Sequence, residues 1–62
     1  MFLKLKSIDC VFDVGASSGQ YGNLLRQIGY KNKIVSFEPL SKTYEDLKKE
    51  AKKDIYWDTY NI

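Results

Sequence analysis

The chain has 62 residues and a net charge of +2, which excludes a partnership with nucleic acid that depends on a strong surplus of charge. A core built by so short a chain buries only about 60% of the surface that its unfolded form exposes, so it is marginal without a disulfide, a metal or a partner. Hydrophobic residues make up 44% of the composition, which is not that of a disordered chain, while one cysteine and no histidine exclude an intrachain disulfide and argue against structural zinc.

The first residues carry no sign of export or of membrane insertion. Residues 1–6 have charges but no apolar run after them, and no apolar run in the chain approaches the roughly 20 residues that cross a bilayer. A lone cysteine also fits a reducing compartment. We therefore expect a cytoplasmic chain without a membrane partner.

The next part of the chain predicts a strand and then a helix. Residues 8–14 are mostly apolar, β-branched or aromatic, which is typical of a strand buried on both faces, with Cys10 as an inert buried side chain. The small residues at 15–19 predict a tight loop, and Gly29 is placed to end the helix in a left-handed conformation. The apolar stripe of this helix comprises Tyr21, Leu24, Leu25 and Ile28.

The second half predicts another strand, another helix and a last strand. Residues 34–38 form a short apolar run that Pro39 ends, and Ser41 is a candidate cap for the helix that follows. The lysine-rich segment 48–53 is interleaved with acidic residues, which favours a solvated helix face over a nucleic-acid site. Residues 55–62 predict the third strand. Its side chains expected in the core are Tyr56, Trp57 and Tyr60.

This order of elements, β-α-β-α-β, predicts an α/β fold. Connections of this length require parallel strands and right-handed crossovers, so we expect a partial Rossmann-like, doubly wound parallel sheet with the strand order 3-2-1. Nothing divides residues 1–62 into more than one unit. In that order the first strand is an open edge, where a second copy of the chain or a missing carboxy-terminal half could pair.

The chemistry is expected in the loop between the first strand and the first helix. At the carboxyl end of a parallel strand, small residues let a ligand approach the backbone, and the helix that follows offers free N–H groups. Asp13 places a carboxylate in the same crevice, and Glu38 ends the second strand, where an acidic side chain can accept hydrogen bonds from ribose hydroxyls. These positions predict a nucleoside-like ligand.

Residues 11–21 and 36–40 together resemble the amino-terminal part of the FkbM family of S-adenosylmethionine-dependent methyltransferases. In that family an Asp-x-Gly-Ala-Asn-x-Gly loop precedes the first helix and a Glu-Pro pair ends the second strand; this chain has Ser17 at the asparagine position. The resemblance implies S-adenosylmethionine as the cofactor and methyl transfer to a hydroxyl of a small molecule or sugar as the reaction.

The resemblance also implies a set of cofactor-binding residues, with no catalytic residue and no metal. The loop residues would line the methionine portion, Glu38 would hold the ribose hydroxyls, and the two residues after it would lie beside the adenine. The complete set is Asp13, Gly15, Ala16, Ser17, Gly19, Gln20, Glu38, Pro39 and Leu40.

The chain ends after the third expected strand, before the strands that carry the acceptor pocket in that family. We therefore expect a truncated amino-terminal part of such an enzyme, and we expect the 62 residues alone to turn over nothing. Two alternatives stay open. One is a fragment of a nicotinamide- or flavin-dependent oxidoreductase, although Ser17 stands at the middle glycine of the dinucleotide fingerprint. The other is a non-enzymatic remnant that pairs through its open sheet edge.

Overall fold

The computed structural model describes residues 9–62, and its elements follow one another in the expected order. The expected strand start at Ile8 lies outside the described residues. The α/β fold class is confirmed. The elements are β1 (Cys10–Val14), α1 (Gln20–Gln27), β2 (Lys33–Phe37), α2 (Ser41–Ala51) and β3 (Trp57–Tyr60).

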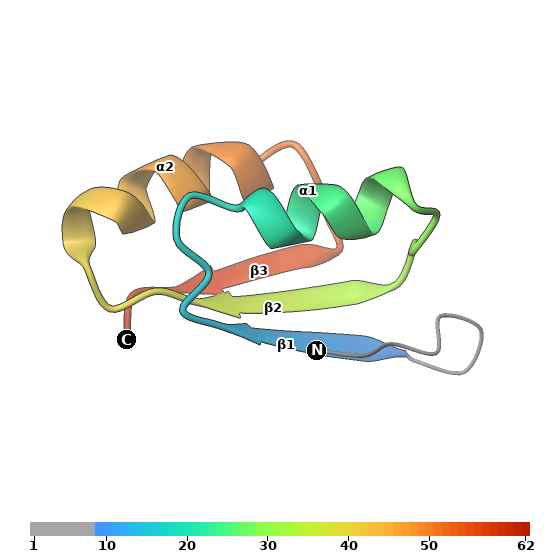
Figure 1. Ribbon diagram of the computed structural model, residues 1–62, viewed down its shortest axis with the longest axis horizontal. Helices are drawn as coiled ribbons and strands as arrows, with labels where there is room; N and C mark the ends of the chain where they lie inside the picture. Colours follow the sequence, from blue (N-terminus) through green and yellow to red (C-terminus); the bar gives the residue numbers. More distant parts are fainter. Residues whose placement is uncertain (1–8) are drawn as a thin grey trace.

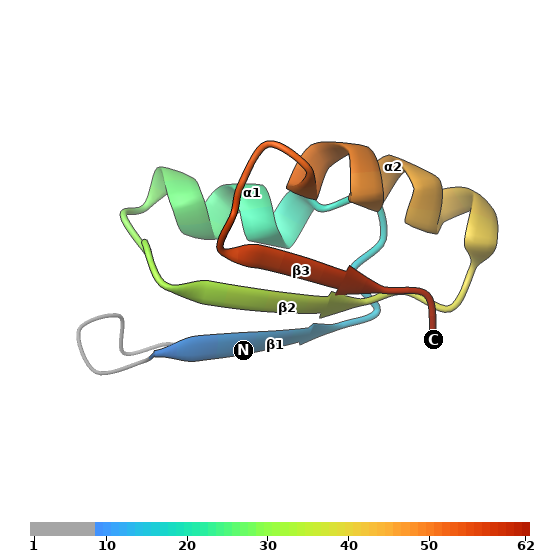
Figure 2. The same ribbon diagram turned by 180° about the vertical axis from the view of Figure 1, so that it is seen from behind.

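The three strands form one parallel sheet in the order β1-β2-β3. Val11 pairs with Ile34, and Ile34 in turn pairs with Trp57. Both helices lie over the same face of this sheet (Figures 1 and 2). Two right-handed crossovers that step in the same direction place their helices on the same side, so the described chain has two layers, one of helices and one of strands.

The core lies between the helices and the sheet. Ile34 and Leu47 are wholly buried there, and Leu25 of α1 reaches the same cluster.

The expected stripe of α2 is confirmed, with Leu47 and Ala51 buried and Tyr44 packed beside them. The stripe of α1 is only partly inside, because Leu24 and Ile28 are exposed. The left-handed Gly29 after α1 is confirmed.

The other face of the sheet is open, and this corrects the prediction of a first strand buried on both faces. Exposed and buried residues alternate along β1, and the relative solvent exposure is 62% for Phe12 and 80% for Val14. Cys10 points to the same open side and is exposed, not buried. The continuous apolar run was a poor guide because no helix of residues 9–62 covers this face.

Two further expectations about aromatic and polar side chains are wrong. Tyr56 and Tyr60 are exposed, and Tyr60 stacks on Phe37 at the open face with ring centroids 5.7 Å apart. Ser41 does not cap α2, because Leu40 occupies that position and the Ser41 hydroxyl is hydrogen-bonded to Asn61. Only Trp57 of the expected aromatic set enters the core.

Trp57 is seated on the backbone of α1. A Cβ atom added at Gly22 would lie 2.2 Å from Trp57 Cζ2, which is far inside van der Waals contact. One at Gly19 would lie 3.4 Å from Trp57 Cη2. The glycine at position 22 therefore permits close packing between α1 and β3, and its presence in the glycine-rich segment has a structural cause.

We expect Gly22→Ala to destabilise the fold by about 1–3 kcal/mol, because the new methyl group must displace the indole ring or the helix. Urea unfolding followed by Trp57 fluorescence measures the change. Gln27→Ala on the exposed side of α1 is the matched control and should leave the midpoint nearly unchanged. An unaltered midpoint for Gly22→Ala would show that the indole is not held against this backbone.

Candidate functional site

The loop that follows β1 is fastened to the end of β2 by its own backbone. The N–H groups of Gly15 and Ala16 both donate to the Phe37 carbonyl oxygen, at 2.9 and 3.0 Å. Gly15 has a φ of +71°, and space is open around the position of its missing Cβ. The glycine thus serves the turn and leaves the loop surface uncovered at that point.

Glu38 closes the loop from the other side. Its carboxylate is 5% exposed and accepts hydrogen bonds from the Ser17 N–H at 2.7 Å and from the Leu40 N–H at 3.0 Å. The two expected halves of the site, the loop after β1 and the acid after β2, are therefore in direct contact. One lone pair on each carboxylate oxygen is used by these bonds, so each oxygen can accept one more.

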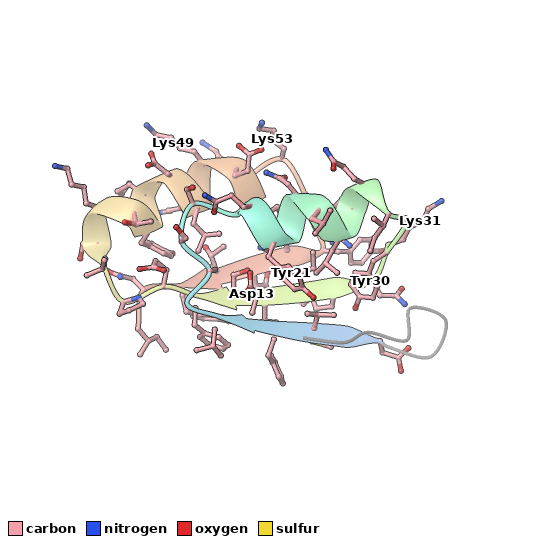
Figure 3. The ribbon with its side chains drawn as sticks, viewed as in Figure 1. Asp13, Tyr21, Tyr30, Lys31, Lys49 and Lys53 are labelled. Carbon is pink, nitrogen blue, oxygen red and sulfur yellow. The ribbon has the colours of Figure 1, made fainter. Side chains whose placement is uncertain are left out.

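Asp13 lies on the face of the sheet that the helices cover (Figure 3). It is 7% exposed, and its Oδ2 atom is buried without a hydrogen-bond partner among the described residues. Burial raises the pKa of this carboxyl group, and a hydrogen bond with the Ser36 side chain opposes the rise. A buried carboxylate oxygen without a donor is costly, which makes Asp13 a candidate for contact with a ligand.

A chain of polar contacts crosses the three strands and ends at Asp13. The Trp57 indole Nε1–H donates to Ser36 Oγ at 2.9 Å, and Ser36, which is wholly buried, pairs with Asp13 across β1 and β2. Sequence reasoning missed Ser36 and its link to Trp57. The available signal was one hydroxyl at the centre of an otherwise apolar run, since a buried hydroxyl needs a partner.

The other predicted site residues lie along the same carboxyl edge of β1 and β2. Ala16 and Gly19 are the buried residues of the loop, and Ala16 belongs to the core cluster. The rest are exposed: Gly15, Ser17, Gln20, Pro39 and Leu40. Within residues 9–62, no group of three or more His, Cys, Asp or Glu side chains could hold a metal ion, and no helix has the length and apolar character needed to cross a membrane.

No protein-family model matches the chain, and no match is found among the curated proteins or the solved structures. The loop after β1, Asp13 and Glu38 are the features of the described residues that point to a function.

Ser17 is held in the left-handed region, with a φ of +57°. Asparagine adopts this region several-fold more readily than most residues, so Ser17→Asn should stabilise the fold by up to about 0.5 kcal/mol. Thermal unfolding measures the gain. The same change at Ser18, which is not left-handed, should give no gain, and equal effects at both positions would contradict the assignment to backbone conformation.

Two aspartates should titrate in opposite directions from the ordinary value. Burial raises the pKa of Asp13, while the Arg26 guanidinium, 2.6 Å from Asp54 Oδ2, lowers the pKa of Asp54. Because its pKa is raised, Asp13 binds its proton more tightly in the folded chain than in the unfolded chain. The free energy of unfolding therefore falls as the pH rises from the pKa of Asp13 in the unfolded chain to its pKa in the folded chain. Asp54 does the opposite, and its stabilising contribution is lost as the pH falls through its lowered pKa.

The side-chain carbonyl ¹³C shifts, followed from pH 2 to 8, measure both midpoints in one sample. A midpoint for Asp13 at or below the ordinary value of an aspartyl carboxyl group would show that this carboxyl group is hydrated and not buried.

Proposed function

We propose that the chain is the S-adenosylmethionine-binding portion of a cytoplasmic methyltransferase with a partial Rossmann-like, doubly wound fold. The observation that carries the proposal is the buried, unpartnered Oδ2 atom of Asp13 beside a small-residue loop at the carboxyl ends of two parallel strands. Crevices at this end of a parallel sheet are where nucleoside ligands bind. In the complete enzyme the acceptor would be a hydroxyl of a small molecule or sugar.

Asp13 suits the amino-acid end of such a ligand. A carboxylate that lacks a donor gains most from a cationic or N–H group, and the ammonium group of the methionine portion is one. The uncovered backbone at Gly15 allows close approach on the same side of the loop. A pyrophosphate, by contrast, would bring negative charge to a buried carboxylate, which disfavours the dinucleotide alternative.

Glu38 suits the ribose. Both of its oxygens retain a lone pair after bonding to the loop and to Leu40, and a vicinal diol can donate to both. Because the side chain is 5% exposed, a ribose would have to reach it through the loop surface near Ser17. The left-handed Ser17 also fits the resemblance, since the usual asparagine of that motif is the residue that tolerates this backbone best.

The bound donor would supply a methyl group on a sulfonium, which transfers to a nucleophile without further activation of the donor. The residues of this chain would bind and orient that donor, which is a contribution of position and not of proton transfer. Asp13 and Glu38 are therefore binding residues in this proposal. No group in the candidate site is placed as a base for the acceptor.

We expect S-adenosylhomocysteine to shift the backbone amide resonances of residues 15–19 and of Glu38 in a ¹H–¹⁵N titration. Asp13→Asn should weaken the binding about tenfold, the amount that corresponds to one charge-assisted hydrogen bond. Asp46→Asn on α2 is the matched control and should bind as the parent chain does.

The same titration with NAD separates the alternatives. Shifts at residues 15–19 from NAD at concentrations where S-adenosylhomocysteine gives none would favour the oxidoreductase fragment. The absence of a response to S-adenosylhomocysteine at millimolar concentration, in a chain shown by circular dichroism to be folded, would overturn the methyltransferase proposal.

A further inference from the structure

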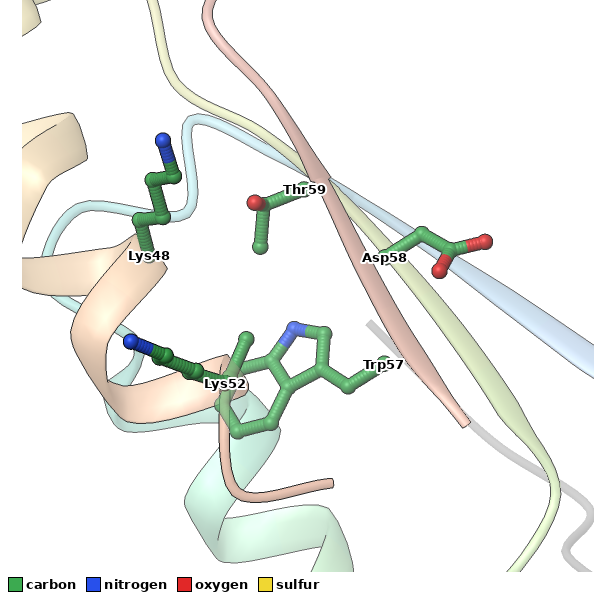
Figure 4. Close-up of a pocket in the computed structure, with 6 residues that line it drawn as sticks. Lys48, Lys52, Trp57, Asp58 and Thr59 are labelled. Carbon is green, nitrogen blue, oxygen red and sulfur yellow. The ribbon is translucent and has the colours of Figure 1, made fainter. Parts of the chain in front are cut away.

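A groove of about 350 Å³ lies between α2 and β3, at the edge of the sheet opposite β1 (Figure 4). It is separate from the loop after β1, and of its lining residues only Trp57 also belongs to the chain of polar contacts that ends at Asp13. One wall is the helix and the other is an edge strand. The lining residues are Lys48, Ala51, Lys52, Trp57, Asp58 and Thr59.

The outer edge of β3 offers one donor and one acceptor to this groove. The carbonyl groups of Tyr56 and Tyr60 accept hydrogen bonds from β2, so in a parallel ladder Trp57 and Thr59 direct their backbone groups away from the sheet. The Trp57 N–H is used, because it donates to Asp54 O at 3.1 Å, and the Thr59 carbonyl accepts a hydrogen bond from the Tyr44 hydroxyl at 3.4 Å and keeps a second lone pair. The Trp57 carbonyl and the Thr59 N–H have no hydrogen-bond partner among the described residues.

The Trp57 carbonyl and the Thr59 N–H bear on whether an added strand would run parallel or antiparallel to β3. In a parallel pair, one residue of the new strand donates to the carbonyl before the opposite residue and accepts from the N–H after it. The Trp57 carbonyl and the Thr59 N–H are that pair, on either side of Asp58. An antiparallel strand would instead need both groups of Trp57, whose N–H is already bonded, or both groups of Thr59, whose carbonyl would have to accept a second hydrogen bond beside that from Tyr44. The parallel direction is therefore favoured.

The charges of the groove select the side chains of that strand. Lys48 lies at the Thr59 end and Lys52 at the Trp57 end, while Asp58 points away from both of them (Figure 4). The Asp58 carboxylate is already paired with Lys33 at 2.8 Å. Among the described residues, neither Lys48 nor Lys52 belongs to an ion pair.

The spacing of the two lysines matches the repeat of a strand. Residues four apart on a helix are separated by about 6 Å along its axis, and residues two apart on a strand by about 6.6 Å. A strand residue opposite Asp58 would share the open face with it, so the residues before and after would point toward α2. Two acidic side chains at those alternate positions would meet Lys52 and Lys48 respectively.

We propose that the α2–β3 groove binds an extended acidic segment of a partner protein as a fourth, parallel strand. The recognised pattern is acidic-x-acidic, with the central residue opposite Asp58. Backbone hydrogen bonds to the strand edge supply affinity and the two lysines supply specificity, as in other cases of strand addition. This surface does not involve Asp13, the loop or Glu38, so the proposal does not depend on the methyl-donor assignment.

The probe is the peptide acetyl-Thr-Val-Glu-Val-Glu-Val-Thr-amide, titrated into the ¹⁵N-labelled chain. We expect the Thr59 amide and the Trp57 indole resonances to shift, with residues 15–19 unmoved. Lys48→Gln combined with Lys52→Gln should weaken binding about tenfold, as the loss of two exposed ion pairs would. Lys42→Gln combined with Lys49→Gln removes the same charge from the same helix and is the matched control.

A peptide with lysine in place of both glutamates should not bind. The same peptide with the central valine N-methylated cannot donate to the Trp57 carbonyl and should bind several-fold more weakly. Equal binding of the N-methylated peptide, or equal shifts from glutarate alone, would mean that the groove holds anions without adding a strand. That result, or a silent Thr59 amide at millimolar peptide, would overturn the proposal.

Discussion

The other parts of this structure depend on the contact between the Trp57 indole and Gly22. It brings the last strand against the first helix, and no side chain larger than hydrogen fits between them. The same indole donates to Ser36, which pairs with Asp13, so one side chain of β3 orders the polar groups of all three strands. A chain of this size has few core residues, and Trp57 is the one tryptophan among those of the described core.

Within the described residues the sheet has two edges and one face that no helix covers, and their chemical characters differ. The uncovered face is apolar towards the carboxyl ends of the strands, where Phe12, Phe37 and Tyr60 form a row of rings, and charged towards the other end, where Lys33 pairs with Asp58. The β3 edge is lined by lysines and keeps only part of its backbone unpaired. An apolar face of this kind invites nonspecific association, whereas the partner proposed for the β3 edge would be recognised by its charge and strand direction.

The order and approximate bounds of the elements could be predicted because each depends on a local pattern, such as the spacing of Tyr44, Leu47 and Ala51 on α2. The meeting of the loop with Glu38 could also be predicted, since parallel strands end at one edge. The exposure of Cys10 and Phe12 could not, because an apolar strand does not reveal which of its faces a helix will cover. The role of Gly22 was hidden for another reason: its partner, Trp57, is 35 residues away in the sequence and meets it only through tertiary packing.

The register of the sheet bears on how such a chain folds. Val11 pairs with Ile34 and Ile34 with Trp57, so each crossover closes a loop of the same 23 residues. The entropy cost of loop closure depends mainly on loop length, so this cost is about the same for the two crossovers. Yet the first crossover lacks the indole that packs on its helix until the second has closed. Chain entropy therefore sets no order between the two halves, and the packing of Trp57 on Gly22 ties the last strand to the helix of the first crossover.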